Sequence, residues 1–316
     1  MKKNQIILLF LSLLSLGNCK KKVAPTPASI EQEPSAKDPA PLLKIFEAVD
    51  GSLLGELGVS ALHIESGQQI AHRGDERFPM QSVYKFPIAM VMLHDIDQGL
   101  FSLQDTIAIF PKEYIPRSGH SPLRDQFPDG VQMPLKEVLA YNISQSDGTA
   151  CDVLLRLLGG TEAVDNRVRH FGSDSIAIAT TEMVQVANDT IQYRNWSTPN
   201  GMNELLEVFH SKEYLSEEGS ELLTEFMSVS TPWFDRRIKG KLPQGTPVAH
   251  KTGTAGTYNG LNRATNDVCI ISLPNGEHLA ISVFVKDSRD QHSAREEAIA
   301  RVARAAYDFW LDGRSR

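Results

Sequence analysis

An uninterrupted apolar run at residues 88–93 predicts a helix that is buried on every side. Proline lacks a backbone N–H and is tolerated only in a first helical turn, so Pro87 requires this helix to begin near residues 83–84. Ser82 then lies at the amino-terminal end, where the helix dipole is positive. Lys85 follows three residues later on the same face. The pattern therefore places a hydroxyl beside an amine at the start of a buried helix.

Strand patterns occur near both ends of the chain, whereas its middle is mostly helical. The expected elements are a helix at 42–49, strands at 57–64 and 69–72, helices at 151–158, 201–210 and 220–227, strands at 246–257, 268–273 and 279–285, and a last helix that opens with a capping box at Ser293–Glu296. We therefore predict an α/β (α+β) fold with one sheet built from both chain ends. Residues 42–80 and 235–316 would form the sheet subdomain, and residues 81–234 an inserted helical subdomain.

The composition is that of an ordinary globular protein. The chain has 316 residues, of which 22% are charged and 41% hydrophobic. This length suffices for one large domain or for two that share a core. The formal net charge of −7 offers no basic surface for nucleic acid or for a membrane. We expect neither as a binding partner of the folded domain.

The first 18 residues have the pattern of a secretory signal peptide, with two lysines followed by a short apolar stretch. Leu16–Cys19 resembles the lipobox of bacterial lipoproteins, which implies lipidation of Cys19. A conventional signal peptide cut nearby is the alternative. Residues 19–41 are rich in proline and predict a flexible tether. We expect an exported, periplasmic, membrane-anchored lipoprotein whose remaining residues, 42–316, form one monomeric folded domain.

The two other cysteines, Cys151 and Cys269, each lie in an apolar segment. We expect two buried free thiols, with a single disulfide as the alternative. His72 and His250 have no partner at a metal-ligand spacing, and neither H-x-H nor C-x-x-C occurs. The sequence therefore predicts no metal site and no cofactor, and argues against a zinc hydrolase.

Three short motifs could together form a serine acyl-transfer site. Ser82 and Lys85 form S-x-x-K, Ser146-Asp147-Gly148 precedes a helix, and Lys251-Thr252-Gly253 lies on a predicted strand. Each motif alone can occur without a catalytic role. S-x-x-K is expected about once by chance in a chain of this length, Ser-Asp-Gly is common in turns, and Lys-Thr-Gly is common on solvent-exposed strand edges. The ordered set is far more specific than any member, because a serine nucleophile needs a base beside it.

This ordered set resembles the signature of class A serine β-lactamases and penicillin-binding proteins. The resemblance covers residues 42–310 and is closest to the extended-spectrum subgroup typified by the PER and VEB enzymes. It rests on four tracts: Ser146–Asp152, Thr181-Glu182, Gln192–Trp196 and Ala249–Thr254. It implies an antiparallel five-stranded sheet flanked by helices, with an inserted all-helical domain. It also implies hydrolysis of small-molecule β-lactams such as penicillins and cephalosporins.

The resemblance implies a role for each matching residue. Ser82 would attack the β-lactam carbonyl, and the backbone N–H groups of Ser82 and Thr254 would form the oxyanion hole. Lys85 would shuttle protons. Ser146 would pass a proton to the leaving lactam nitrogen, and Lys251 would lower the pKa of Ser146.

Further residues would bind the substrate or activate water. Thr252, Gly253 and Thr254 would face the substrate carboxylate, supported by Arg237. Glu182, on an omega-shaped loop at residues 180–196, would activate the water that hydrolyses the acyl-enzyme.

Three positions bear on this assignment. Gly148 stands where the family usually has an asparagine that binds the substrate amide. Val186 stands where a polar side chain usually helps to hold the deacylating water, and valine offers no hydrogen bond. His120 matches an aromatic gate at the rim of such sites, or is an exposed loop histidine without a role.

Two alternatives remain open at this level. A D-alanyl-D-alanine peptidase would share Ser82, Lys85, Ser146 and Lys251 but would not need Glu182. A non-hydrolysing β-lactam-binding protein would be acylated and stay so, as Gly148 and Val186 would allow.

Overall fold

The computed structural model describes residues 37–229 and 234–311 of the chain. Its main sheet is antiparallel, in the order β2-β1-β11-β10-β8, and the short β9 pairs with β10. The strands of this sheet are β1 (Glu56–His63), β2 (Gln68–His72), β8 (Val248–Thr254), β9 (Thr257–Tyr258), β10 (Leu261–Ser272) and β11 (His278–Ser288). The expected sheet of five antiparallel strands from both chain ends is confirmed, with β9 as a short addition.

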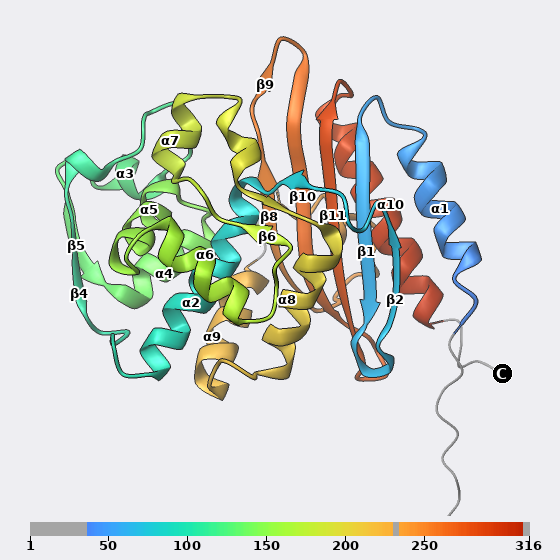
Figure 1. The fold of residues 1–316 in the computed structure, drawn as a ribbon, viewed down its shortest axis with the longest axis horizontal. Coiled ribbons are helices and arrows are strands. Elements are labelled where there is room, and N and C mark those ends of the chain that lie inside the picture. Colours follow the sequence, from blue (N-terminus) through green and yellow to red (C-terminus); the bar gives the residue numbers. More distant parts are fainter. Residues whose placement is uncertain (1–36, 230–233, 312–316) are drawn as a thin grey trace, which may run out of the picture. The chain divides into compact units, whose positions relative to one another are not determined.

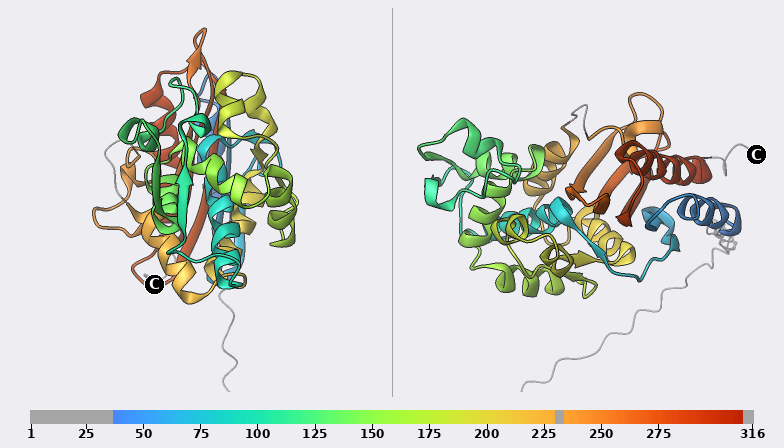
Figure 2. Two further views of the ribbon diagram at one scale, coloured as in Figure 1. Left: turned by 90° about the vertical axis from the view of Figure 1, so that its left-hand side faces the viewer. Right: turned by 90° about the horizontal axis from the view of Figure 1, so that it is seen from above.

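Both faces of the sheet are covered by helices. Helices α1 (Ala40–Asp50) and α10 (His292–Leu311) pack on one face, and the helical part of the chain covers the other (Figures 1 and 2). Successive side chains of a strand point to opposite faces, so β11 contributes to two cores. Leu279 and Ile281 pack with α1 and α10, whereas Ala280 and Phe284 pack with the helical part.

The helical part is built around α2, whose burial confirms the first prediction. Its side chains from Lys85 to Leu93 are all buried. The helices of this part are α2 (Lys85–Asp97), α3 (Pro122–Gln126), α4 (Leu135–Ser144), α5 (Gly148–Leu157), α6 (Thr161–His170), α7 (Glu182–Ala187), α8 (Pro199–Ser211) and α9 (Glu217–Ser228). Two small sheets complete it, one from β3 (Phe78–Pro79), β6 (Ile176–Ala177) and β7 (Trp196–Ser197), the other from β4 (Thr106–Ile109) and β5 (Val131–Pro134).

Several element boundaries differ from the sequence-based expectations. The helix α10 begins at His292, so Ser293 lies inside it and the expected capping box does not form. The strand β10 begins at Leu261 rather than at 268, because pairing with β8, β9 and β11 extends it through a polar stretch. The predicted tether overlaps α1, and the backbone carbonyl of Lys37 accepts a hydrogen bond from Gln68.

The remaining expectations have different outcomes. Cys151 and Cys269 are buried free thiols, as expected.

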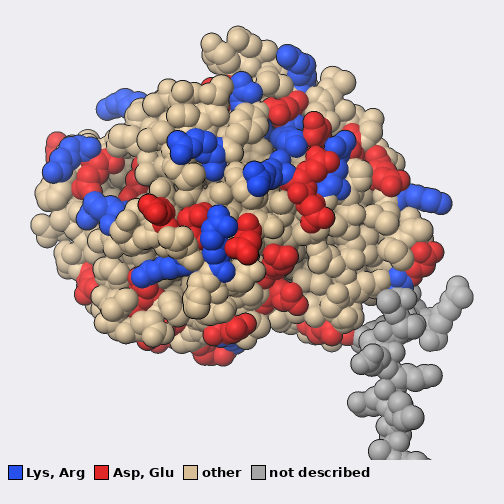
Figure 3. Space-filling view, in the orientation of Figure 1, with Lys and Arg blue, Asp and Glu red and all other residues tan. Residues whose placement is uncertain are grey.

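Residues 37–229 and 234–311 include no helix that is both long and apolar enough to cross a membrane. Lysine, arginine and acidic side chains are interspersed on the face shown in Figure 3, rather than gathered by sign. The signal peptide at 1–18 and Cys19 lie outside the described residues.

Candidate active site

Three predicted site residues form one hydrogen-bonded group. Ser82 lies in a 3-10 helix (Gln81–Tyr84) that leads into α2, and Lys85 is the first residue of α2. The Nζ atom of Lys85 donates to Ser82 Oγ at 2.8 Å and also contacts Glu182 Oε1. Glu182 is the first residue of α7, which packs against α5. The fold thus brings the hydroxyl and the amine together with the loop carboxylate of Glu182, which lies 97 residues beyond Lys85 in the sequence.

The pKa of Lys85 is shifted in the direction opposite to that expected of a buried lysine that acts as a base. A buried lysine that acts as a base would ordinarily have a lowered pKa. Burial, the largest single effect, lowers the pKa of Lys85, but the Glu182 carboxylate together with the other acidic groups around it leaves this pKa raised. Lys85 is therefore an ammonium paired with Glu182, and must lose a proton before it can accept one.

A second group forms between the Ser146 loop and β8. Lys251 Nζ donates to Ser146 Oγ at 2.8 Å and to the carbonyl oxygen of Thr252 at 3.1 Å. Burial, assisted by the positive charge of Lys85, lowers the pKa of Lys251 to about 7. The lysine with a lowered pKa is thus Lys251 rather than Lys85.

The end of β8 lies close to the chain just before Ser82. A Cβ atom at Gly253 would overlap the carbonyl oxygen of Met80, so this approach requires glycine. Arg237 is buried beside it, donating from Nη1 to the Gly253 carbonyl at 3.0 Å and from Nη2 to Thr254 Oγ1 at 2.6 Å. The guanidinium therefore anchors the predicted carboxylate-binding strand, and Thr254 is the residue of that strand exposed to solvent.

The Ser146 loop is held by contacts that sequence reasoning did not identify. Ser146 has a φ of +55°, a conformation that costs a non-glycine residue free energy. Asp147 stabilises the turn by accepting from the N–H groups of Leu123 and Ala150 at 2.7 and 2.8 Å. His120 is exposed, and its Nε2 lies 2.9 Å from the carbonyl oxygen of Gln145. His120 thus contacts the loop beside Ser146.

The loop at 180–196 has closed ends, as an omega-shaped loop requires. Asn195 donates to the Thr180 carbonyl at 2.8 Å and accepts from the Thr180 N–H at 2.9 Å. Asp152, a residue of α5 that sequence reasoning gave no role, binds the N–H groups of Glu182 and Met183 at 2.7 and 2.9 Å. Asp152 therefore fixes the first turn of α7, and with it the position of Glu182.

The burial of Asp152 makes protein stability depend on pH. Burial, opposed by its two backbone hydrogen bonds, raises the pKa of Asp152 from 3.8 to about 7. Ionised Asp152 therefore opposes folding above pH 7, and this cost fades as the pH falls and the folded state retains the proton. We expect Asp152→Asn to gain about 2–3 kcal/mol in free energy of unfolding, relative to the parent, between pH 5 and pH 8.

Urea denaturation of both proteins at the two pH values measures this difference. The loss of a backbone hydrogen bond in the variant is the same at both pH values and cancels. Parallel pH dependences in the two proteins would show that Asp152 does not titrate in this range.

Ile115 occupies the space that a side chain at Gly148 would enter. A Cβ atom at Gly148 would lie 2.5 Å from Ile115 Cδ1 and 3.4 Å from Glu182 Cβ. Val186, the other departure from the family pattern, lies against Gly119. A Cβ atom at Gly119 would lie 2.6 Å from Val186 Cγ2. The two departures from the family pattern thus border one apolar region on the α7 side of the site.

We expect Gly148→Asn alone to destabilise the protein by about 1–3 kcal/mol, because the side chain overpacks against Ile115. The double variant Ile115→Ala/Gly148→Asn removes the obstructing atoms and should recover part of that loss. Thermal unfolding of the two single variants and the double variant measures the coupling. Strictly additive effects would contradict the proposed contact.

The family described as the β-lactamase enzyme family matches residues 43–310. The chain is 38% identical to β-lactamase VEB-1 of Pseudomonas aeruginosa, over 81% of this chain and 86% of that protein. It is also 38% identical to the extended-spectrum β-lactamase PER-1 of the same organism, over 86% of this chain and 88% of that protein.

Solved structures give the same result. A β-lactamase from Chitinophaga pinensis DSM 2588 superimposes with a TM-score of 0.83 at 39% identity, covering 85% of this chain and 99% of that chain. The TLA-1 extended-spectrum β-lactamase superimposes with a TM-score of 0.84 at 36% identity, covering 87% of this chain and 100% of that chain.

Proposed function

The chain belongs to the β-lactamase enzyme family, and on that premise we propose that it hydrolyses penicillins and cephalosporins through an acyl-enzyme on Ser82. The observation that carries this proposal is the position of one lysine atom. Lys85 Nζ contacts both Ser82 Oγ and the carboxylate of Glu182. A nucleophile, a proton carrier and a candidate base for water therefore share one hydrogen-bonded group.

Acylation requires a proton to leave Ser82. Because Lys85 is held as an ammonium by Glu182, its proton first passes to that carboxylate, the acceptor in direct contact with Nζ. The neutral amine then takes the Ser82 proton as Oγ attacks the lactam carbonyl. The backbone N–H groups of Ser82 and Thr254 stabilise the oxyanion of the tetrahedral intermediate.

Opening of the ring requires a proton on the lactam nitrogen. Ser146 delivers it, and is supplied in turn by Lys251, whose ammonium donates to Ser146 Oγ. With a pKa of about 7, Lys251 exchanges protons readily near neutral pH. The substrate carboxylate lies against Thr252, Gly253 and Thr254, where Arg237 adds positive charge.

Hydrolysis of the ester needs a base for the attacking water. Glu182 first releases to bulk water the proton that it took during acylation, and Lys251 regains a proton from bulk water. The Glu182 carboxylate then accepts a proton from the water that attacks the Ser82 ester, the ammonium of Lys85 protonates Ser82 Oγ as it leaves, and Glu182 returns its proton to Lys85. The hydrogen bonds from its own N–H and that of Met183 to Asp152 hold the start of α7 in place for this step.

Time-resolved mass measurement of the intact protein mixed with a cephalosporin tests this route. We expect an added mass on the protein that appears during turnover and disappears when substrate is exhausted, and that a digest of the trapped intermediate places on the peptide containing Ser82. An adduct that persists would indicate a β-lactam-binding protein or a penicillin-sensitive peptidase instead. Ile115 beside Gly148 and the apolar Val186 are the features that would then explain slow deacylation.

We further infer from the sequence of residues 16–19 that Cys19 is lipidated and that the enzyme is an exported, periplasmic, membrane-anchored monomer. Replacing Cys19 by alanine should move the activity from the membrane fraction to the soluble fraction. An unchanged distribution would favour a conventional signal peptide.

A further inference from the structure

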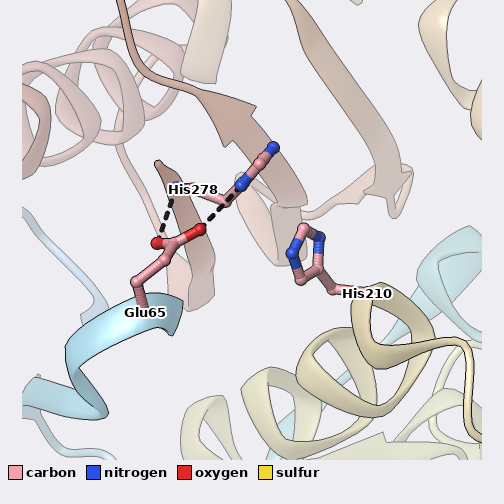
Figure 4. Close-up of side chains that lie close together, drawn as sticks. All are labelled: Glu65, His210 and His278. Atoms are coloured by element: carbon pink, nitrogen blue, oxygen red, sulfur yellow. Dashed lines mark hydrogen bonds and ion pairs between the residues drawn. The ribbon is translucent and has the colours of Figure 1, made fainter. Parts of the chain in front are cut away.

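Three metal-ligating side chains meet at one end of the main sheet. Glu65 lies in the 3-10 turn between β1 and β2, His210 in the last turn of α8, and His278 at the start of β11. Each offers a ligand atom, and these atoms lie within 4.8 Å of one another. Figure 4 shows the three side chains converging from their three separate elements. Within residues 37–229 and 234–311 this is the one such cluster of three.

The Glu65–His278 pair is already ordered. Glu65 accepts from the backbone N–H of His278 at 2.8 Å, and its other carboxylate oxygen lies 2.8 Å from His278 Nδ1. The His210 ring faces this pair, with its centroid 4.4 Å from that of His278. Two of the three side chains are thus fixed relative to one another, and the third approaches from a different part of the chain.

The donor set matches the preferences of a borderline divalent metal. Two imidazoles and one carboxylate are a set that Zn²⁺ binds, and imidazole also suits Ni²⁺ and Cu²⁺. Tetrahedral ligands about 2.0–2.1 Å from a zinc ion stand about 3.4 Å apart, so closure needs a movement of about 1 Å. None of the three side chains belongs to a fully buried residue, so such a movement is available.

We propose that Glu65, His210 and His278 form a zinc-binding site that joins the β1–β2 turn, α8 and β11. A cavity of about 550 Å³ is lined by both imidazoles and by Lys212, Glu221 and Ser272. It leaves room for a water molecule as the fourth ligand.

The proposed site lies far from the acyl-transfer residues. His278 pairs with Ser272 of β10, whereas Thr254 pairs with Thr265, seven residues earlier on that strand. At about 3.3 Å per residue the two places are about 23 Å apart. Zinc is therefore expected to stabilise the fold by linking three distant segments, without taking part in β-lactam hydrolysis.

Isothermal titration of the full chain, prepared without a histidine tag, with Zn²⁺ tests the proposal. We expect one zinc ion per chain with micromolar or tighter affinity, and a melting temperature raised by about 5 °C at a hundredfold excess over the dissociation constant. His210→Ala and Glu65→Gln should each weaken binding at least tenfold. His170→Ala, at an exposed histidine outside the cluster, is the matched control and should bind as the parent does.

Cobalt gives a readout that folding defects do not mimic. Co²⁺ in the parent should show visible absorption of a low-coordinate site, and His210→Ala should lose it while keeping its far-ultraviolet circular dichroism. The proposal would be overturned if the parent failed to bind zinc. It would also be overturned if His210→Ala and Glu65→Gln bound zinc as tightly as the parent does. Because the variants leave Ser82 and Glu182 untouched, unchanged hydrolysis of a cephalosporin keeps this result separate from the proposed catalytic route.

Discussion

Replacing Glu182 by glutamine is expected to convert continuous β-lactam hydrolysis into a single stoichiometric release of product. Glutamine keeps the size of the side chain and its contact distance to Lys85, but it cannot accept a proton from water. Acylation of Ser82 should survive in part, because without the Glu182 carboxylate burial lowers the pKa of Lys85 and a neutral amine can take the Ser82 proton directly. Deacylation should slow by about 10²–10⁴-fold, the usual contribution of a general base. Stopped-flow absorbance with a chromogenic cephalosporin measures the burst and the steady state together.

Two observations accompany that experiment. The intact-mass spectrum of Glu182→Gln should show a long-lived adduct, and Glu137→Gln, at an exposed acid of α4, should turn over like the parent. If Glu182→Gln lacks both burst and adduct, Glu182 is required for acylation as well, as its contact with Lys85 allows. Steady hydrolysis at the parental rate would show that another group activates the water.

Replacing Ser82 by alanine is expected to abolish the adduct and to reduce hydrolysis by about 10⁶-fold, the loss seen when a serine hydrolase loses its nucleophile. The Lys85–Glu182 and Lys251–Ser146 contacts do not depend on Ser82 Oγ, so the fold and the carboxylate-binding strand should persist. Steady-state hydrolysis and intact mass measure the loss, and equilibrium binding of a penicillin measures what remains.

The matched control for this variant is Ser211→Ala, at an exposed serine of α8 that should leave hydrolysis unchanged. A Ser82→Ala protein that retains both folding and an adduct would place the nucleophile elsewhere, with Ser146 as the first candidate. Loss of folding in the variant is checked by its thermal transition, which we expect to stay within about 0.5–1 kcal/mol of the parent for a partly exposed serine.

The sequence by itself determined the fold class and the main chemical groups. The apolar run at 88–93 indicates an element buried on every side, and Pro87, which is tolerated in a first helical turn, indicates where a helix through this run begins. Near-continuous apolar stretches predicted β1 and β11, because a strand between two helical layers needs apolar side chains on both faces. The spacing of Ser82 and Lys85 places them together because both lie on one helical turn.

Tertiary structure decided everything that depends on contacts between distant segments. Asp152 holds Glu182 only because α5 packs against α7, and Ile115 blocks the space beside Gly148 only because its loop reaches the start of α5. The opposite pKa directions of Lys85 and Lys251 arise in the same way, since burial lowers both pKa values and the Glu182 carboxylate in contact with Lys85 helps to raise that one. Glu65, His210 and His278 lie too far apart in sequence for any spacing rule to join them. The periodicity of apolar residues in one segment indicates which of its faces is buried. It does not indicate which other segment packs on that face, because that depends on how the whole chain folds.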